Sequence, residues 1–405
     1  MQTRRNFIGS ASGLAGALLA PQRVLGANDR IRFGIIGPGA RGKQDLRAAM
    51  NCPNTEFAAA ADVYTRRLEE AKAIKADIKT YLDYRNLLED KTIDAVLIAT
   101  PQHLHCEHFV AAMDAGKHVY QEKTMAFTVE HAKRMRAAYQ RAGKRTVQIG
   151  HQGASMGQIA DAIEFMKTGV GKVTNIHSHM YRSWPHGRAQ WTRPILPDMT
   201  TENIIWKLFQ GESTHDFEPN RYINWRFYWD YSGGNFYENM CHQLAIWYKV
   251  LHLQIPTAIT TVGGIYCVKD GREVPDIMAT NMQHADDLLF TWDSGFGNGK
   301  LGITEDVLGQ DATLTNASEM GGPIKYTPER ANRREDSEKV GPTTANTRDG
   351  TGAHMQNFMD CIRSGQEPNA PFELGFRVSI ACRAAVDSYR QGRTLRWNPE
   401  KEEII

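Results

Sequence analysis

The strongest constraint on the fold is a glycine-rich turn that joins an apolar strand to a helix near the start of the chain. The run IRFGIIG at residues 31–37 is short and apolar, which is typical of a buried strand. Gly37, Gly39 and Gly42 then form the pattern G-x-G-x-x-G. Here the first glycine permits a tight turn, the second lets backbone approach a pyrophosphate, and the third packs helix on strand. The sequence therefore predicts a dinucleotide-binding unit.

An acidic residue stands where such a unit binds the ribose. Asp62 ends the second predicted strand, 20 residues after Gly42. A carboxylate at this place binds ribose hydroxyls and repels a 2′-phosphate, which favours NAD. Arg66 and Arg67 follow closely and could reverse that preference, so NADP stays open. The predicted cofactor-binding residues are Gly37, Gly39, Ala40, Arg41, Gly42, Asp62, Arg66, Thr100, Pro101, His103, His105, Glu122 and Lys123.

Strands and helices alternate through the first third of the chain. Apolar runs at 55–63 and 93–101 are separated by helical segments, which predicts a parallel, doubly wound sheet in residues 28–150. The alternating run at 172–184 is instead typical of an open antiparallel sheet, so residues 151–405 are expected to form a second domain.

The last hundred residues contain a predicted loop and two predicted helices. Residues 310–350 are rich in Gly, Thr, Asn and charge, which favours a long surface loop. Residues 354–366 and 376–392 are helical in pattern, and each run ends in or near a glycine.

The first 27 residues have the composition of an export signal. Arg4, Arg5 and Phe7 precede a Gly/Ala-rich apolar run that ends at Ala27, which resembles a twin-arginine signal. The alternative is a disordered tail that happens to contain two arginines. The signal predicts export by the twin-arginine machinery, to the periplasm or beyond, of a protein that is already folded.

Charge and hydropathy exclude two classes of partner. Residues 1–27 hold three of the 48 basic side chains and no acidic one, so the rest of the chain carries 45 basic against 46 acidic side chains. That balance gives no basic stripe for nucleic acid. No run approaches the roughly 18 apolar residues of a membrane helix, so no membrane insertion is expected of the mature chain.

Two segments contain candidate catalytic residues. Lys123 follows the fifth predicted strand, at the sheet edge where ligands bind, although a lone lysine there could equally be an exposed loop residue. Glu238 and His242 lie four residues apart, on one face of a predicted helix. A carboxylate beside His242 would raise the pKa of that histidine and orient it as a general base. The pair could also be a plain surface salt bridge.

The segment PQHLHCEH at 101–108 suggests metal binding, but we interpret it otherwise. His103 and His105 follow a strand at its carboxyl end and are expected to line the nicotinamide pocket. No second ligand cluster completes a site, so no metal is expected. The six cysteines include no C-x-x-C pair and are expected to form no disulfides.

Aromatic residues are concentrated between 184 and 247, which holds six of the eight tryptophans. Some of these rings could stack on a sugar, although core packing explains most of them equally well. The candidate substrate contacts are His151, Tyr181, Arg182, Trp225, Arg226 and Trp229.

Together these motifs resemble the glucose–fructose oxidoreductase/inositol dehydrogenase/rhizopine catabolism (Gfo/Idh/MocA) family, from about Arg30 to Trp397. That family combines the glycine loop with E-K-P and then G-G-x-x-x-D-x-x-x-H. This chain has Glu122-Lys123-Thr124, and Gly233-Gly234 through Glu238 to His242. The resemblance implies a Rossmann α/β domain and a C-terminal α+β domain with a large open, mainly antiparallel sheet. In that family, sister subunits often pack on this sheet, so the resemblance implies a homodimer or homotetramer. It also implies that helices at about 353–392 pack back on the first domain.

The resemblance also implies residue roles. His242 would take a proton from a sugar hydroxyl, Lys123 would polarise that oxygen, and Glu238 stands in place of the usual Asp. Thr124 in place of proline, Glu238 itself, and Ala245 in place of an acid depart from the family pattern. These departures bear on the mechanism more than on the fold or the cofactor.

Three functions remain open from the sequence. The first is an exported, NAD(P)-dependent oxidoreductase for a sugar, polyol or glycoside, whose tightly bound cofactor is recycled in place. The second is an NAD-dependent glycosidase or lyase that oxidises C3 transiently, eliminates the aglycone and returns the hydride. The third is a sugar-binding protein without catalysis, which the presence of both Lys123 and His242 disfavours.

Overall fold

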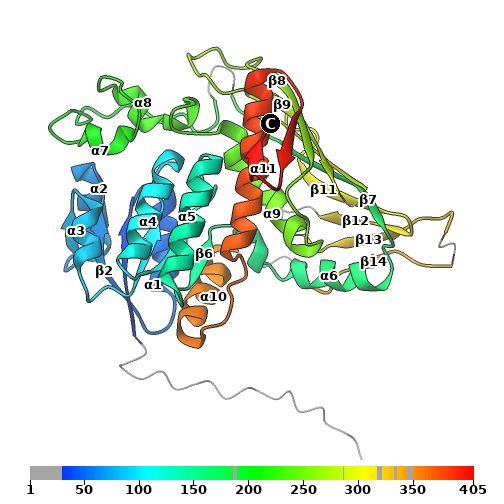
Figure 1. Ribbon diagram of the computed structural model, residues 1–405, viewed down its shortest axis with the longest axis horizontal. Coiled ribbons are helices and arrows are strands. Elements are labelled where there is room, and N and C mark those ends of the chain that lie inside the picture. Colours follow the sequence, from blue (N-terminus) through cyan, green and yellow to red (C-terminus); the bar gives the residue numbers. More distant parts are fainter. Residues whose placement is uncertain (1–29, 186–188, 286, 317–321, 333–334, 344–349) are drawn as a thin grey trace, which may run out of the picture.

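The computed structural model describes residues 30–185, 189–285, 287–316, 322–332, 335–343 and 350–405. They form two domains that lie side by side, with the long helix α11 (Phe372–Gln391) between them (Figure 1). The predicted signal at 1–27 lies outside the described residues. Within the described part, no helix is both long and apolar enough to span a membrane.

The first domain is a parallel sheet with helices on both faces, as the alternating pattern predicts. Its strand order is β3-β2-β1-β4-β5-β6, and every described pairing is parallel. This order is that of a Rossmann domain, in which ligands bind beyond the carboxyl ends of the strands. The elements are β1 (Ile31–Ile36), α1 (Ala40–Met50), β2 (Thr55–Ala61), α2 (Thr65–Ile74), β3 (Lys79–Tyr81), α3 (Tyr84–Glu89), β4 (Ala95–Ile98), η2 (Gln102–Leu104), α4 (His105–Asp114), β5 (His118–Gln121), α5 (Val129–Ala142) and β6 (Val147–Ile149).

The second domain is built on a large mixed sheet, mostly antiparallel. Its strand order is β14-β13-β12-β11-β7-β10-β9-β8-β15-β16. Among the described strands of this sheet, β7 and β10 form the one parallel pair. Burial along β9 largely alternates, so one face of the sheet packs on helices and the other is open. The strands are β7 (Val173–Tyr181), β8 (Ala258–Gly264), β9 (Ile277–His284), β10 (Leu288–Gly295), β11 (Ile303–Gly309), β12 (Ala312–Asn316), β13 (Lys325–Pro328), β14 (Lys339–Val340), β15 (Leu395–Asn398) and β16 (Glu403–Ile404).

Helices cover the inner face of this sheet and connect it to the first domain. The long core cluster of the second domain includes Trp247 and Trp292, both fully buried. The helical elements are η3 (Gln152–Ser155), α6 (Gln158–Thr168), α7 (Trp206–Gln210), α8 (Pro219–Ile223), η4 (Trp225–Phe227), the π-helical turn η5 (Phe236–Met240), α9 (Cys241–Val250), α10 (Thr351–Ser364) and α11.

The expectation of a loop over 310–350 is wrong for part of that segment. The strands β12, β13 and β14 lie within it and extend one edge of the sheet. The run ATLTN of β12 alternates buried and half-buried side chains. The polar composition of the segment conceals this period of two, because threonine fits the half-buried face of a strand.

The two C-terminal helices pack on the first domain. Helix α10 lies against α1, and its residues Met355, Phe358 and Met359 belong to the same core cluster as Phe33. Helix α11 contributes apolar side chains to the core clusters of both domains. Both helices end at a glycine in the left-handed region, Gly365 and Gly392.

We expect Phe358→Ala to destabilise the first domain by about 3–5 kcal/mol, because this fully buried ring leaves a cavity next to Tyr120. Chemical denaturation followed by circular dichroism measures the loss. The control is Gln356→Ala on a more exposed position of α10, where the change should stay within about 0.5 kcal/mol. Equal midpoints for the two variants would show that α10 does not stabilise this core.

Candidate active site

Two adjoining cavities lie at the carboxyl edge of the parallel sheet. The glycine-loop cavity has a volume of about 280 Å³ and is lined by Gly37, Gly39 and the end of β2. The inner cavity, of about 240 Å³, is lined by Lys123, Glu238 and His242 among others. The two cavities share the lining residues Arg41, Ala99, Thr100, Trp191, Trp225 and Arg226. A ligand in one would therefore reach the other.

Two of the three motif glycines are required by their surroundings, and the third leaves the backbone open to the cavity. Gly37 has φ +85°, and a Cβ there would lie 2.9 Å from the Ala99 carbonyl oxygen. A Cβ on Gly42 would lie 2.2 Å from the Gly37 carbonyl oxygen. A Cβ on Gly39 would meet no atom within 4 Å, so backbone is exposed to the cavity there. Helix α1 has no side-chain cap, and its first turn is open to a pyrophosphate.

Asp62 lies in the glycine-loop cavity, as the spacing predicts. It accepts a hydrogen bond from the Tyr64 N–H at 2.9 Å, and burial raises the pKa of its carboxyl to about 6. The prediction for Arg66 needs correction. Its Nε lies 2.7 Å from Asp198 Oδ2 of the second domain, and Arg67 lines the cavity instead. The helical rotation of α2 decides which of two adjacent arginines faces the ligand.

The other predicted cofactor contacts divide into two groups. Ala40, Arg41, Thr100 and Pro101 line the glycine-loop cavity, and Glu122 and Lys123 line the inner cavity. Arg41 crosses between them, with Nε 3.0 Å from Glu122 Oε1.

His103 and His105 do not line either of these cavities, which corrects their predicted role. The His103 Nε2 lies 2.6 Å from the Phe209 carbonyl oxygen, and burial lowers the pKa of His103 to about 4. The His105 ring is fully buried, with Nδ1 2.8 Å from the Thr124 carbonyl oxygen and Nε2 2.9 Å from that of Thr100. His105 therefore fixes the turn that presents Lys123.

A buried ion-pair network joins the two domains at the inner cavity. Lys123 Nζ lies 2.9 Å from Glu238 Oε2, and Arg226 Nε lies 3.2 Å from the same oxygen. Gln102 donates a hydrogen bond to Glu238 Oε1 at 2.7 Å. Burial opposes the charge of Glu238, but Arg226 and Lys123 outweigh it and lower the pKa of Glu238 to about 2. In place of the motif proline, Thr124 donates to the Tyr237 carbonyl oxygen at 2.8 Å.

The expected pairing of Glu238 with His242 is wrong. The Glu238 carboxylate faces two cations, which attract it more strongly than a neutral imidazole does. The π-helical turn η5 directly before α9 also replaces the regular helix on which the pairing was predicted. Burial, Lys123 and His151 hold the pKa of His242 well below its usual value, whereas a carboxylate partner would have raised it.

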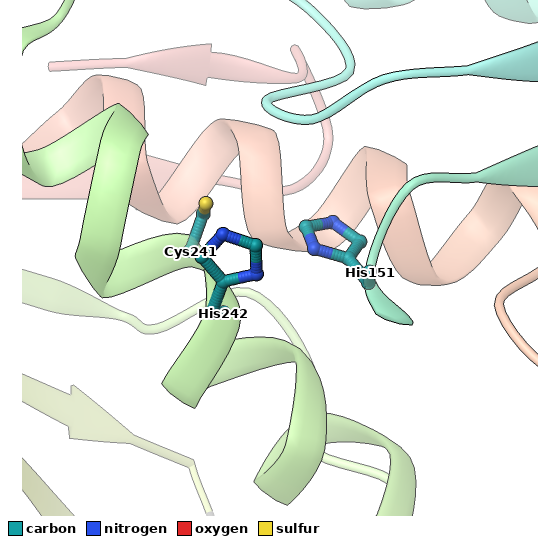
Figure 2. Close-up of side chains that lie close together, drawn as sticks. All are labelled: His151, Cys241 and His242. Atoms are coloured by element: carbon teal, nitrogen blue, oxygen red, sulfur yellow. The ribbon is translucent and has the colours of Figure 1, made fainter. Parts of the chain in front are cut away.

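Two further side chains surround His242. Figure 2 shows the rings of His151 and His242 next to each other, with Cys241 beside His242. One possible ligand atom from each of the three lies within 4.8 Å of the others. The Cys241 thiol donates to the Tyr237 carbonyl oxygen, and burial raises its pKa to about 11. With Lys123 also near, this site favours a polar neutral ligand over a cation.

The His151 side chain has two unpaired ring nitrogens. It is 1% exposed, and neither ring nitrogen has a hydrogen-bond partner. Burial lowers the pKa of His151 to about 3, so the ring is neutral at ordinary pH. A buried imidazole with two unpaired nitrogens next to His242 is suited to bind a substrate hydroxyl or a water.

The remaining substrate candidates are divided by the fold. Trp225 and Arg226 line both cavities, and the Arg226 guanidinium lies 4.2 Å from the Trp225 ring centroid. Tyr181 and Arg182 lie at the end of β7 and line neither cavity, although Arg182 is near enough to lower the pKa of His242.

The structure corrects the assignment of Trp229. This residue lines a third cavity of about 620 Å³, with Arg390 5.3 Å from its ring centroid. Trp191, one of the aromatic residues considered for sugar stacking, lines both cavities. The sequence analysis did not assign Arg193, Gln152 and Asn239 to the site, and these are among the other lining residues. They carry no motif, and their positions follow from the path of the chain between the domains.

We expect the His242 imidazole to titrate below pH 6.5, because burial and its neighbouring groups, Lys123 foremost, destabilise its charged form. NMR of the ring resonances measures the midpoint. Lys123→Met removes one of those groups and should move the midpoint upward, whereas Lys207→Met, at an exposed residue outside both cavities, should leave it unchanged. A wild-type midpoint above 6.5 would restore the predicted carboxylate partner.

Two family models match the chain. Residues 31–151 match "Oxidoreductase family, NAD-binding Rossmann fold" (GFO_IDH_MocA), and residues 207–396 match the "Oxidoreductase family, C-terminal alpha/beta domain" (GFO_IDH_MocA_C). The intervening residues 152–206 match neither.

Curated relatives resemble part of the chain. The 1-carboxy-3-chloro-3,4-dihydroxycyclohexa-1,5-diene dehydrogenase of Comamonas testosteroni is 34% identical over 152 residues, 37% of this chain and 38% of that protein. An inositol 2-dehydrogenase of Salmonella typhimurium is 37% identical over 124 residues, 30% of this chain and 36% of that protein. The matched stretch thus covers little more than a third of these relatives.

Solved structures share the fold over nearly the whole described chain. A levoglucosan dehydrogenase in complex with NADH and levoglucosan has a TM-score of 0.72 and 18% identity, covering 91% of this chain and 99% of the other. The aldose-aldose oxidoreductase of Caulobacter crescentus has a TM-score of 0.68 and 18% identity, with the same coverage. The chain therefore belongs to the Gfo/Idh/MocA oxidoreductase family, with an NAD-binding Rossmann domain and a C-terminal α/β domain.

Proposed function

We propose that this protein is an exported, NAD-dependent oxidoreductase that acts on a hydroxyl group of a sugar, polyol or glycoside and retains its cofactor. The observation that carries the proposal is the inner cavity. It is lined by both the Lys123 ammonium and the neutral His242 imidazole, and it shares lining residues with the glycine-loop cavity, where NAD is expected to bind.

The substrate class is supported by the lining and by the relatives. Gln152 and Asn239 offer amide groups to hydroxyls, and Trp191 and Trp225 offer flat apolar faces to a sugar ring. The names of the relatives above include an inositol dehydrogenase and a levoglucosan dehydrogenase, which act on polyhydroxylated rings.

Each residue has a role in the proposed oxidation. NAD⁺, when bound, supplies the hydride acceptor. The substrate C–H bond breaks with its electron pair, and a C=O bond forms as His242 takes the hydroxyl proton. Lys123 donates a hydrogen bond to the same oxygen and stabilises its developing negative charge. Glu238 holds Lys123 in place. His151, beside His242, binds a neighbouring hydroxyl or carries the proton onward.

Export and cofactor retention belong to the same proposal. A twin-arginine substrate crosses the membrane folded, so NAD would be bound before export and must return to its starting state in place. A second sugar that accepts the hydride meets this need. The open face of the large sheet, which exposes Val262 and Leu289, is the proposed contact between subunits of a homodimer or homotetramer.

The second candidate, an NAD-dependent glycosidase, is favoured by one observation. Elimination at C2 and hydration need a further proton-transfer group, and His151 is a second buried imidazole beside His242. In this sequence C3 is oxidised, the C2 proton and the aglycone leave, water adds, and hydride returns to C3.

The test begins with purified mature protein, which should release NAD on denaturation. A panel of sugars and aryl glycosides is then mixed with native protein while nicotinamide reduction and aglycone release are followed. Sugar-dependent reduction supports the oxidoreductase, and aglycone release without net reduction supports the glycosidase. Neither signal from a broad panel would contradict both.

We expect His242→Asn and Lys123→Met each to lower kcat by about 10²–10⁴-fold, because each removes a group that moves or stabilises charge in the transition state. The bound NAD should remain, as measured after denaturation. His252→Asn changes an exposed histidine outside the cavities and should keep full activity. Unchanged turnover in His242→Asn would exclude this histidine as the base.

A further inference from the structure

One segment of the second domain forms part of the wall of the glycine-loop cavity. We define the crossover segment as residues 189–226. Its first part lies between the two family matches, and the rest, from residue 207, lies at the start of the second match. It contributes Trp191, Arg193, Phe209, Tyr222, Ile223 and Trp225 to the wall of the glycine-loop cavity. Figure 1 shows its helices α7 and α8 beyond the end of the first domain, near α2.

The crossover segment is bonded directly to the first domain beside the ribose end of the cavity. Ile204 pairs with Tyr64 in an antiparallel bridge. The Ile205 N–H donates to the Val63 carbonyl oxygen at 2.9 Å, and the Asn203 carbonyl oxygen accepts from Thr65 N–H at 3.0 Å. These backbone bonds involve the three residues that directly follow Asp62, so they fix the segment beside the place where the ribose is expected to bind.

A side-chain ion pair reinforces this attachment. Arg66 Nε lies 2.7 Å from Asp198 Oδ2, and both side chains are partly exposed. Such a pair is worth little by itself, but it can open without disrupting the backbone bridge.

Arg193 extends from the crossover segment into the cavity without a carboxylate partner among the described residues. The other cavity arginines have one, since Arg41 pairs with Glu122, Arg67 with Glu70 and Arg226 with Glu238. Burial and the charges of Arg226 and Arg67 lower the pKa of Arg193. The Arg193 guanidinium therefore lies near two other positive charges and has no negative side chain among the described residues to balance it.

The backbone around Arg193 is held in place. Its N–H donates to Asn224 Oδ1 at 2.8 Å, and its carbonyl oxygen accepts from Asn224 Nδ2 at 3.2 Å. Asn224 is itself buried. The Arg193 guanidinium is thus attached to a fixed backbone, and it lines the cavity together with Arg67 and Arg226.

The anion that suits this position is the pyrophosphate of the dinucleotide. It lies, when bound, over the glycine loop and the uncapped start of α1, which line the same cavity as Arg193. We propose that Arg193 binds the pyrophosphate from the side of the second domain, and that the crossover segment retains the dinucleotide between the two domains. This inference rests on the proposed retention of the cofactor and gives it a structural cause.

The test measures binding without turnover. NADH is bound to the protein and displaced with excess NAD⁺, and the fluorescence change gives the dissociation rate. Arg193→Gln should raise this rate by roughly 10- to 100-fold, since it removes a charge-assisted bond to the phosphates. Arg193→Lys should restore part of the loss. Lys207→Gln removes one positive charge from the same segment outside the cavity and should leave the rate unchanged.

Two smaller ligands separate a phosphate contact from a loosened segment. Arg193→Gln should weaken ADP by a similar factor and leave adenosine unchanged, because adenosine has no phosphate. Equal losses for ADP and adenosine, or a dissociation rate equal to that of Lys207→Gln, would overturn the proposal. These results do not depend on any sugar being turned over, so they stand apart from the test of the proposed function.

A separate experiment tests the ion pair that attaches the crossover segment to the first domain. Asp198→Asn breaks the pair with Arg66 at the surface. If the crossover segment opens to admit the dinucleotide, association and dissociation of NADH should both accelerate a few-fold, with little change in Kd. Unchanged rates in both directions would contradict a role of this segment in retention.

Discussion

The active site depends on one buried carboxylate shared between two cations. Glu238 lies on the π-helical turn of the second domain, Lys123 on the turn after β5, and Arg226 at the end of the crossover segment. A buried carboxylate is costly unless it is paired, so the three segments can come together stably only with all three charges in place. The position of the proposed catalytic lysine, the seam between the domains and the wall of the NAD cavity are therefore coupled.

This coupling accounts for the departures from the family pattern. The longer Glu238 reaches Lys123 and Arg226 and leaves His242 without a carboxylate, so His242 stays a neutral imidazole in a positive surrounding. Thr124 replaces the constraint of a proline with a hydrogen bond to the carbonyl of Tyr237, and His105 binds the carbonyl of Thr124 itself. The turn of Lys123 is thus held from both domains.

Sequence reasoning located the fold and the chemistry but not the pairing of the side chains. The glycine pattern, Asp62, Lys123 and His242 follow from spacing along single elements, because a strand end or a helix start fixes where such residues lie. The roles of Arg66, His103, His105 and Trp229 were misassigned, since neighbouring residues on a helix or loop face different cavities and only the packing selects between them.

What the sequence determined by itself is local: a Rossmann domain that binds NAD, a second domain with a mostly antiparallel sheet, and the positions of Lys123 and His242, the two residues proposed for proton transfer. Periodicity and turn preferences depend on residues that are close together in the sequence, so these features can be predicted from the sequence alone. The tertiary structure decided which charges meet. Glu238 lies 115 residues from Lys123, and Asp198 lies 132 residues from Arg66. Contacts over such separations are decided by how the two domains pack on each other, which no pattern along a few residues encodes.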